Sequence, residues 1–378
     1  MSLKSKDIES IDPMPAESEN TAIIKNLTRT GHVNNNLAGS KVFFETVMQL
    51  HLSASRTTAD SKNRFYRIGE FIICLSFASD ALIPRITPAF EHLAVEPVDS
   101  PDLIVCLWDS VSTKTAMAPT PWRAVDYLIH GKVRGYNDGH FQTAVSMVSG
   151  ALSMLDLLNN KAVWWTKDAR KVPTVESGSP LLAILDWWLS RKGYHYMHAG
   201  AVGTPEGGVL LMGTGGSGKS TTSITCIDSP FSFVADDYCL LTHNPAPYVH
   251  SIYNSGKLDK QSVKRLARLN LSFFNKDKPN DEKLLTFLHS THSEKIVNGF
   301  PVKAVLLPMV RGKTRSFLEK IQPIEALKTI APNNLLQFTG VKNAALKAVV
   351  KLVNQVPCYR LYLGSDIKGI HRTIQEVL

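Results

Sequence analysis

The chain has 378 residues, of which 44% are hydrophobic and 20% are charged, and its formal net charge is +9. These proportions are typical of a soluble globular protein, and no apolar run is long enough to span a membrane. The length predicts two or three domains.

The net charge and the spacing of the cysteines limit the expected partners, metal sites and location of the protein. The positive charge indicates either a solvated basic surface or attraction to anions such as nucleotides and acidic peptides. No RGG run, basic helix or zinc-finger spacing is visible, so nucleic acid is not expected as a partner. The five cysteines are scattered without a CxxC pair, which predicts neither disulfides nor a zinc site. The N-terminus lacks the apolar stretch of a signal peptide, so the expected location is the cytoplasm.

The first part of the chain divides into a tail and an α/β region. Residues 1–38 are polar and without periodicity, which predicts a disordered tail. Residues 39–178 are expected to form an N-terminal α/β region. Its strand signals lie at 64–78 and 103–107, a short helix is predicted at 88–93, and antiparallel strands are predicted within 130–167.

The second part, residues 179–378, is predicted to be a separate domain that opens with a helix. Ser179 is the expected N-cap and Pro180 the first helical residue, and Gly193 is expected to end the helix. Short strands are predicted at 199–202 and 208–212, with a turn between them.

A glycine-rich segment after the second of these strands carries the strongest chemical signal. It matches the pattern G-x-x-x-x-G-K-[ST] between an apolar strand and a potential helix. Its residues, with the first of the following helix, are Gly213, Thr214, Gly215, Gly216, Ser217, Gly218, Lys219, Ser220 and Thr221. Glycines let backbone N–H groups and the start of the helix reach phosphate oxygens. Lys219 would meet the β and γ phosphates, and Ser220 would offer its hydroxyl to Mg²⁺.

An apolar run, 231–235, ends in two carboxylates, Asp236 and Asp237. A strand ending there would hold both at the carboxyl edge of the sheet, where α/β folds bind ligands. One carboxylate could hold Mg²⁺, and the other could accept a proton from an attacking hydroxyl. The alternative is a solvated Asp-Asp turn without a function, but the nearby glycine loop favours the functional interpretation.

Two further residues are candidates for the site because of their position in the sequence relative to the glycine loop and the aspartates. His198 begins the strand pair that leads into the glycine loop, although a lone histidine is more often structural. Lys257 follows the aspartates in a turn-rich stretch and could neutralise charge on a transferring group, or could equally be a solvated loop lysine.

Together, His198-Ala-Gly-Ala-Val, the glycine loop and Val-Ala-Asp236-Asp237 resemble the HPr kinase/phosphorylase family. The resemblance is clear over about 195–240 and extends to strands near 305–307 and 359–363. It implies the P-loop fold shared with phosphoenolpyruvate carboxykinase, an active-site role for His198, a base role for Asp236 and a metal role for Asp237. The E-[IV]-R-G-[LI]-G segment used for dephosphorylation is absent, which argues against HPr itself as the acceptor. The chain looks more like the branch that includes kinases of lasso precursor peptides.

The predicted reaction is therefore transfer of the γ-phosphate of ATP, with Mg²⁺, to a hydroxyl of a peptide, protein or small molecule. Two alternatives stay open. One is a nucleotide-dependent switch or slow NTPase. The other is a carboxykinase-like enzyme, for which no second metal site with Lys and His ligands is identified. The acceptor, the choice between ATP and GTP, and homo-oligomerisation are left undecided.

Overall fold

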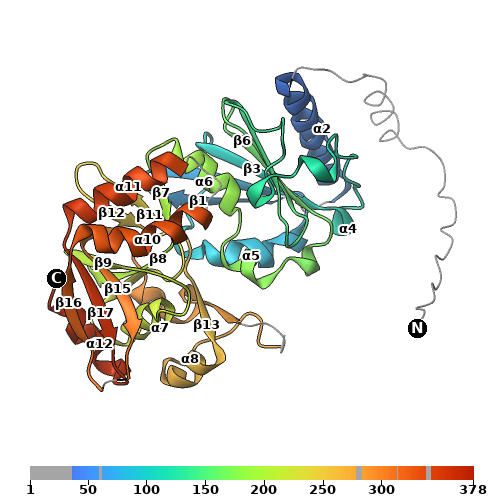
Figure 1. The fold of residues 1–378 in the computed structure, drawn as a ribbon. Coiled ribbons are helices and arrows are strands. Elements are labelled where there is room, and N and C mark those ends of the chain that lie inside the picture. The colour runs from blue at the N-terminus through green and yellow to red at the C-terminus, as the bar shows by residue number, and fades with distance from the viewer. Residues whose placement is uncertain (1–35, 59–61, 278–282, 313, 338–341) are drawn as a thin grey trace, which may run out of the picture.

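The computed structural model describes residues 36–58, 62–277, 283–312, 314–337 and 342–378. The predicted α/β class is confirmed, because several sheets pack against helices (Figure 1). Most of the predicted tail, residues 1–35, lies outside the described part. Residues 36–38 were also assigned to the tail, but they belong to α2, the first helix that the structure describes, which begins at Asn36. Within the described ranges no helix is both long and apolar enough for a bilayer span.

A six-stranded sheet forms the N-terminal region, with the strand order β1-β2-β3-β6-β5-β4. The strands are β1 (Lys62–Ile68), β2 (Phe71–Phe77), β3 (Leu103–Asp109), β4 (Phe141–Val145), β5 (Leu152–Asp156) and β6 (Lys161–Thr166). Helix α2 (Asn36–Thr57) covers one face, where Phe44 and Val47 pack against Trp108 and Met154. The opposite face packs on helix α6 (Leu182–Ser190), which follows later in the chain.

One local prediction for this region is confirmed and one needs correction. The strand character expected over 64–78 is confirmed as two strands, because Gly69 adopts φ +59° and turns the chain between β1 and β2. The predicted helix at 88–93 is a pair of 3₁₀ turns, Thr87–Ala89 and Glu91–Leu93. The antiparallel strands expected within 130–167 are confirmed as β4, β5 and β6.

The helix expected after residue 179 is present, but it starts later than predicted. Ser179 ends the short helix α5 (Thr174–Gly178), and its hydroxyl donates to the Val175 carbonyl instead of capping a new helix. Leu181 then takes a left-handed conformation with φ +59°, and α6 runs over Leu182–Ser190. The left-handed residue changes the direction of the chain between α5 and α6, and α6 buries its apolar side chains against the first sheet.

The second sheet has nine strands and carries the glycine loop. Its main path is β10-β8-β9-β15-β12-β11-β7, and β17 pairs with both β15 and β16. The strands are β7 (His195–Met197), β8 (Ala199–Thr204), β9 (Gly207–Met212), β10 (Ser232–Ala235), β11 (Cys239–Thr242), β12 (Tyr248–His250), β15 (Gly299–Val310), β16 (Phe317–Ile321) and β17 (Cys358–Leu363). A separate hairpin pairs β13 (Ser255–Asp259) with β14 (Lys283–Phe287).

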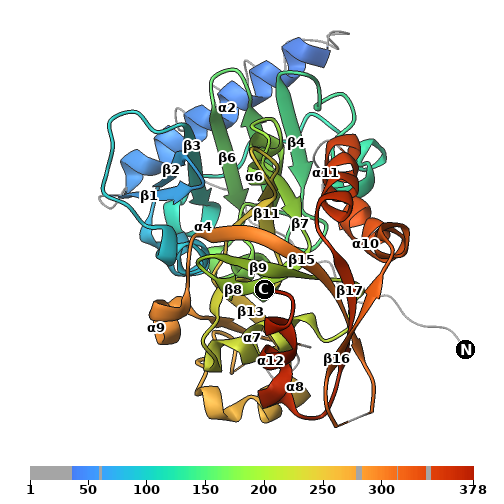
Figure 2. The same cartoon turned by 90° about the vertical axis from the view of Figure 1, so that its left-hand side faces the viewer.

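Helices cover both faces of this sheet (Figures 1 and 2). One face packs on α10 (Pro323–Gln337) and α11 (Lys342–Gln355). The other packs on α7 (Lys219–Thr225) and α12 (Ile370–Gln375), with α8 (Lys260–Arg265) beyond them. The remaining short helices are α3 (Ile83–Ile86), α4 (Ser110–Thr113) and α9 (His289–His292). The strands expected from sequence at 305–307 and 359–363 lie within β15 and β17, and the expected last helix is α12.

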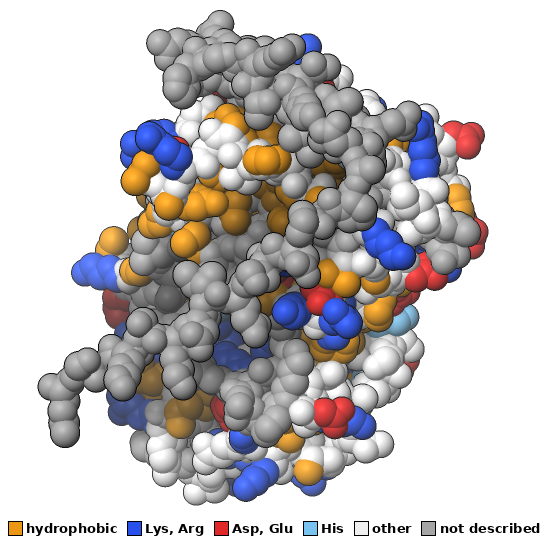
Figure 3. Space-filling model, turned by 90° about the vertical axis from the view of Figure 1, so that its right-hand side faces the viewer, with side chains coloured by type: hydrophobic (Ala, Val, Ile, Leu, Met, Phe, Trp, Pro, Cys, Tyr) orange, Lys and Arg blue, Asp and Glu red, His pale blue; other side chains and the backbone are white. Residues whose placement is uncertain are grey.

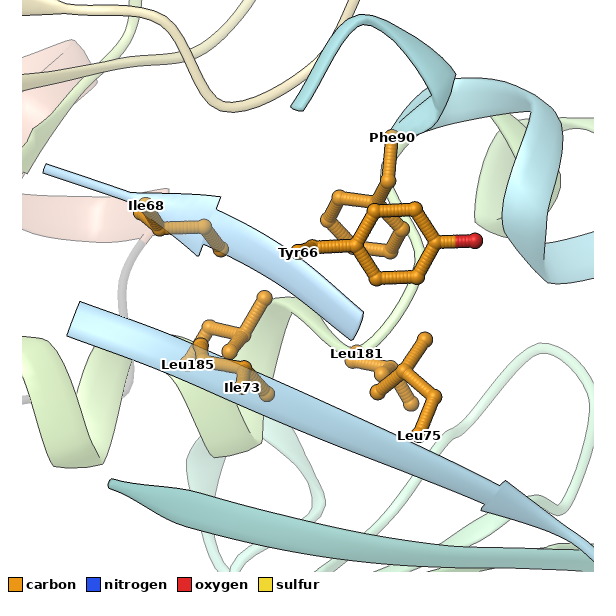
Figure 4. Close-up of a pocket in the computed structure, with 7 residues that line it drawn as sticks. All are labelled: Tyr66, Ile68, Ile73, Leu75, Phe90, Leu181 and Leu185. Atoms are coloured by element: carbon orange, nitrogen blue, oxygen red, sulfur yellow. The ribbon is translucent and has the colours of Figure 1, made fainter. Parts of the chain in front are cut away.

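The two sheets are joined by a continuous core. Tyr253 and Leu285, from the second half of the chain, pack in one cluster with α6 and the first sheet. A small apolar void of about 10 Å³ remains among β1, β2, Phe90 and the start of α6 (Figure 4), about the space of one water molecule. The face in Figure 3 is hollowed between an upper part rich in hydrophobic side chains and a lower part with more Lys and Arg. The division at residue 178 stays a prediction.

Candidate functional site

Strand directions bring the predicted site residues to one edge of the second sheet. β8 is antiparallel to both of its neighbours, β9 and β10. Lys219 follows the end of β9, and Asp236 and Asp237 follow the end of β10. His198 stands just before β8 begins, which is the same edge. Ligands bind at the carboxyl ends of strands in α/β sheets, so this edge is the expected place for a site.

The glycine loop 213–218 has a backbone that favours glycine. Gly213, Gly216 and Gly218 have φ of +143°, +76° and +101°, which side chains rarely adopt. A Cβ at Gly215 or Gly216 would meet no heavy atom within 4 Å, so the middle of the loop faces open space. A ligand therefore has room to approach the loop backbone closely.

Lys219 lies folded over this loop. Its Nζ donates to the carbonyl oxygens of Gly213, at 2.9 Å, and Thr214, at 3.0 Å, and the residue is only 7% exposed. Burial lowers the pKa of Lys219, while the charges of Asp237 and Asp236 oppose that shift. The ammonium is thus held at the loop, between its carbonyls and the two carboxylates.

Asp236 is enclosed by hydrogen-bond donors. Ser223 Oγ donates to its Oδ1 at 2.6 Å, and the backbone N–H of Lys257 donates to its Oδ2 at 3.0 Å. Burial raises the pKa of Asp236, and the bonds from Ser223 and Lys257, with a smaller effect of the Ser220 hydroxyl, only partly offset the cost of burying its charge. This carboxyl therefore holds its proton to a higher pH than an exposed aspartate.

Asp237 has the opposite electrostatic environment. Lys257 Nζ lies 2.8 Å from Oδ2, and His198 Nε2 lies 3.1 Å from Oδ1. Burial alone would raise the pKa of Asp237, but Lys257 and then His198 outweigh it and hold the pKa well below its ordinary value. The side chain keeps 22% of its surface exposed. Asp237 is therefore ionised and accessible at neutral pH.

Lys257, which the sequence left undecided, is part of this cluster. It lies on β13, with its Nζ 3.4 Å from Ser179 Oγ and 5.6 Å from the ring centroid of Tyr238. Gly178 has no side chain to obstruct it, since a Cβ there would come within 2.9 Å of Lys257 Cε. The lysine is consequently a packed site residue and not a solvated loop lysine.

The N-terminal region holds the strand that carries Lys257. Asn254, fully buried, donates from Nδ2 to the carbonyls of Pro88 at 2.8 Å and Ala89 at 3.0 Å. Its Oδ1 accepts the His289 N–H at 3.3 Å. Ser255 Oγ donates to the Gly178 carbonyl. These bonds fix the start of β13 against the first half of the chain.

The structure thus gathers His198, Lys219, Ser220, Asp236 and Asp237 at one edge. Sequence reasoning did not single out Ser223, because a serine in the second turn of a helix carries no motif signal. Ser179 was recognised only as a cap, since its contact with Lys257 depends on a fold-back between residues far apart in sequence. Thr221 is directed to α8, where its Oγ1 lies 2.9 Å from Ser262 Oγ.

Oxygen atoms for a divalent cation lie together at Ser220 and Asp236. No group of three or more His, Cys, Asp or Glu side chains is arranged for a metal ion in the described ranges. Mg²⁺ usually binds through one or two carboxylates together with phosphate oxygens of a substrate, and Asp236 and Ser220 are the residues that could hold it here. Asp237, expected to be the metal ligand, lies instead beside Lys257 and His198.

No protein-family model matches the chain, and no curated protein matches it. Among solved structures the chain is similar to the Hpr(Ser) kinase/phosphatase from Coxiella burnetii, at 12% sequence identity over 48% of this chain and 94% of that chain. The TM-score is 0.25.

Proposed function

We propose that this chain is an ATP- and Mg²⁺-dependent kinase that transfers the γ-phosphate to a hydroxyl group. One observation carries the proposal: an ionised, accessible carboxylate, Asp237, lies between Lys257 and His198 at the edge that also bears the glycine loop. A simple nucleotide-binding loop has no need of such a group. A phosphotransferase needs it to receive the acceptor hydroxyl.

The glycine loop and Lys219 would bind the phosphates. Open space around Gly215 and Gly216 gives phosphate oxygens access to the loop N–H groups. Lys219 donates to two loop carbonyls, which are weaker acceptors than phosphate oxygens. The ammonium can therefore exchange these carbonyls for a phosphate without a large movement of the helix.

Ser220 and Asp236 are the residues that would hold Mg²⁺. The Ser220 hydroxyl lies close enough to Asp236 to lower the pKa of its carboxyl slightly, so the two oxygen ligands are near each other. A bound Mg²⁺ would neutralise part of the phosphate charge during transfer. This assignment exchanges the roles that the family resemblance suggested for the two aspartates. We infer the exchange because Asp236 is buried among donors, whereas Asp237 is open to an incoming group.

Asp237 would orient the acceptor hydroxyl and take up its proton. Each of its oxygens has one contact, with His198 or Lys257, and keeps a further lone pair for the hydroxyl. Its low pKa limits its strength as a base but keeps it ionised, which is sufficient where transfer depends mainly on positioning and electrostatics. Lys257 would also stabilise negative charge on the transferring group.

We also propose a fold type and a class of acceptor. The fold would be the P-loop type shared by HPr kinase and phosphoenolpyruvate carboxykinase. The acceptor hydroxyl, of serine type, would belong to a peptide, a protein or a small molecule.

Transfer of label from ATP labelled in its γ-phosphate tests the proposal. The purified protein is incubated with this ATP, Mg²⁺ and a nucleotide-free extract of the producing cell. We expect an acid-stable phosphoester in the extract with the wild-type protein and none with Lys219→Ala. Label recovered entirely as inorganic phosphate would favour a slow NTPase or switch. Equal labelling by the Lys219→Ala variant would remove the glycine loop from the reaction.

A further inference from the structure

The hairpin of β13 and β14 turns one of its faces to the candidate site. Across the hairpin Lys257 pairs with Leu285, and Asp259 pairs with Lys283. Directly opposed residues of an antiparallel pair, and residues two apart on one strand, lie on the same face. A Cβ at Gly178 would lie 2.9 Å from Lys257 Cε and from Leu285 Cδ1, so this face packs on the end of α5. Lys283 therefore shares the face of the hairpin that presents Lys257 to the site.

The other face of the hairpin lies against α7, with α8 nearby (Figure 1). A Cβ at Gly256 would come 2.6 Å from Ile224 Cδ1 of α7. The hairpin is thus held between α5 and α7, the helix that begins with Lys219 of the glycine loop. Lys283 is close enough to Lys219 for its charge to lower the pKa of Lys219. The two ammonium groups therefore lie in the same region of the site.

Lys283 is exposed, and the carboxylate opposite it on the hairpin serves another purpose. That carboxylate is Asp259, whose Oδ1 accepts the Ser262 N–H at 2.7 Å and caps the start of α8. In the part of the chain that the structure describes, no salt bridge involves Lys283. Its positive charge is therefore available to an anion bound at the site.

The site as a whole carries more positive than negative charge. Lys219, Lys257 and Lys283 supply three ammonium groups, and the carboxylates are those of Asp236 and Asp237. Burial opposes the negative charge of Asp236 and raises its pKa, whereas the pKa of Asp237 is held low. Several ammonium groups gathered around one space are typical of a binding place for a phosphate group.

We propose that Lys283 is a catalytic residue that binds the γ-phosphoryl group as it passes from the nucleotide to the acceptor. Lys283 shares a hairpin face with Lys257, beside Asp237, where the acceptor hydroxyl would bind. The terminal phosphate is the part of the nucleotide that meets the acceptor, so it would lie on this side of the glycine loop. The proposal rests on the proposed function and adds a cation for the transferred group.

The transfer step itself leaves Lys283 unchanged. The bond between the γ-phosphorus and the bridging oxygen of the leaving ADP breaks, and a bond to the acceptor oxygen forms. The hydroxyl proton passes to Asp237, and ADP keeps the electron pair of the broken bond. Lys283 donates hydrogen bonds to oxygens of the transferred group, which stabilises their charge in the transition state.

The test compares two nucleotides that differ only in the γ-phosphate. Lys283→Met removes the charge and keeps an unbranched side chain, and Lys283→Arg keeps the charge. Binding of Mg-ATP and of Mg-ADP is measured by titration calorimetry. We expect Lys283→Met to bind Mg-ATP about tenfold more weakly, as for loss of a charged hydrogen bond, and Mg-ADP as the wild type does. Lys283→Arg should bind both nucleotides nearly as the wild type does.

Lys320→Met is the matched control, because it removes the same charge from an exposed position on β16 and should change neither affinity. Unchanged Mg-ATP affinity in Lys283→Met would overturn the role of Lys283, as would equal weakening of Mg-ATP and Mg-ADP or an equal effect of the control. If Lys219→Ala bound both nucleotides normally, or the wild type bound neither, the proposed function would be wrong and the role of Lys283 with it. A thermal melt shows whether each variant is folded, and Lys283→Gln serves as the second variant if Lys283→Met is not.

Discussion

Lys257 contacts both aspartates of the site: its backbone N–H donates to Asp236 Oδ2 at 3.0 Å, and its Nζ lies 2.8 Å from Asp237 Oδ2. One residue of β13 thus fixes the position of one carboxylate and the charge of the other. The side chain can be removed while the backbone bond to Asp236 remains. Substitution at Lys257 therefore tests the electrostatic role of Asp237 separately from the geometry of Asp236.

Replacing Lys257 with Met should raise the pKa of Asp237, because the nearest cation that stabilises the carboxylate is lost. We expect phosphate transfer to fall by about 10²-fold at neutral pH, as for loss of a charge-stabilising group. The acid limb of the pH–rate profile should also move to higher pH. Lys257→Arg, which keeps the charge, should recover part of the rate. An unmoved acid limb in the Met variant would show that Lys257 does not control Asp237.

Asp236→Asn tests the proposed Mg²⁺ site. The pKa of Asp236 is raised by burial, so its protonated form should compete with the cation as the pH falls. Mg²⁺-dependent nucleotide binding by the wild-type protein should weaken at acid pH, and the asparagine variant should lose both the Mg²⁺ dependence and most of this pH dependence. Fluorescence titration with a nucleotide analogue at several Mg²⁺ concentrations measures both. An Asn variant with normal Mg²⁺ dependence would place the cation elsewhere.

Asn254→Ala should destabilise the fold, because the Pro88 and Ala89 carbonyls and the His289 N–H lose a buried partner. We expect the free energy of unfolding to fall by about 2–4 kcal/mol. Urea unfolding provides the measurement. Asn63→Ala, at an exposed position on β1, is the control and should have little effect. Identical urea midpoints for the two variants would mean that Asn254 does not join the two halves of the chain.

The stability of the protein should fall with acid because of buried histidines. Burial lowers the pKa of His92 to about 3 and that of His250 to about 4, from an ordinary value of 6.5. Below pH 6.5 the unfolded chain binds protons that the folded protein does not, so the free energy of unfolding decreases from there down to about pH 4 for His250 and about pH 3 for His92. The expected loss is on the order of a few kcal/mol.

Urea unfolding at neutral and acid pH checks this dependence, and the variant His250→Gln provides the comparison. Glutamine can replace the contact between His250 Nε2 and Thr242 Oγ1 without titrating. The difference in stability between the two pH values should therefore be smaller in the variant. An equal difference in both proteins would assign the acid sensitivity to other groups.

The sequence predicts which residues meet at this edge better than it predicts the packing around them. The glycine loop and the apolar run ending in two aspartates are local patterns, so their strands and their common edge follow from α/β topology. Lys257 could not be assigned, because its contact with Asp237 requires β13 to fold back against Ser179. The late start of α6 was missed because Leu181 takes a left-handed conformation that no glycine or asparagine signals. Long-range contacts and an unusual backbone conformation decide these features.

The most direct test of the account is a single-turnover assay of Asp237→Asn against the wild-type protein, with ATP labelled in its γ-phosphate and the acceptor fraction of the extract. Amide for carboxylate keeps the shape but removes the charge that receives the hydroxyl proton. We predict that the variant binds Mg-ATP within about twofold of wild type and transfers phosphate about 10²–10⁴-fold more slowly. Transfer by the variant at the wild-type rate would contradict the central claim that Asp237 receives the acceptor hydroxyl.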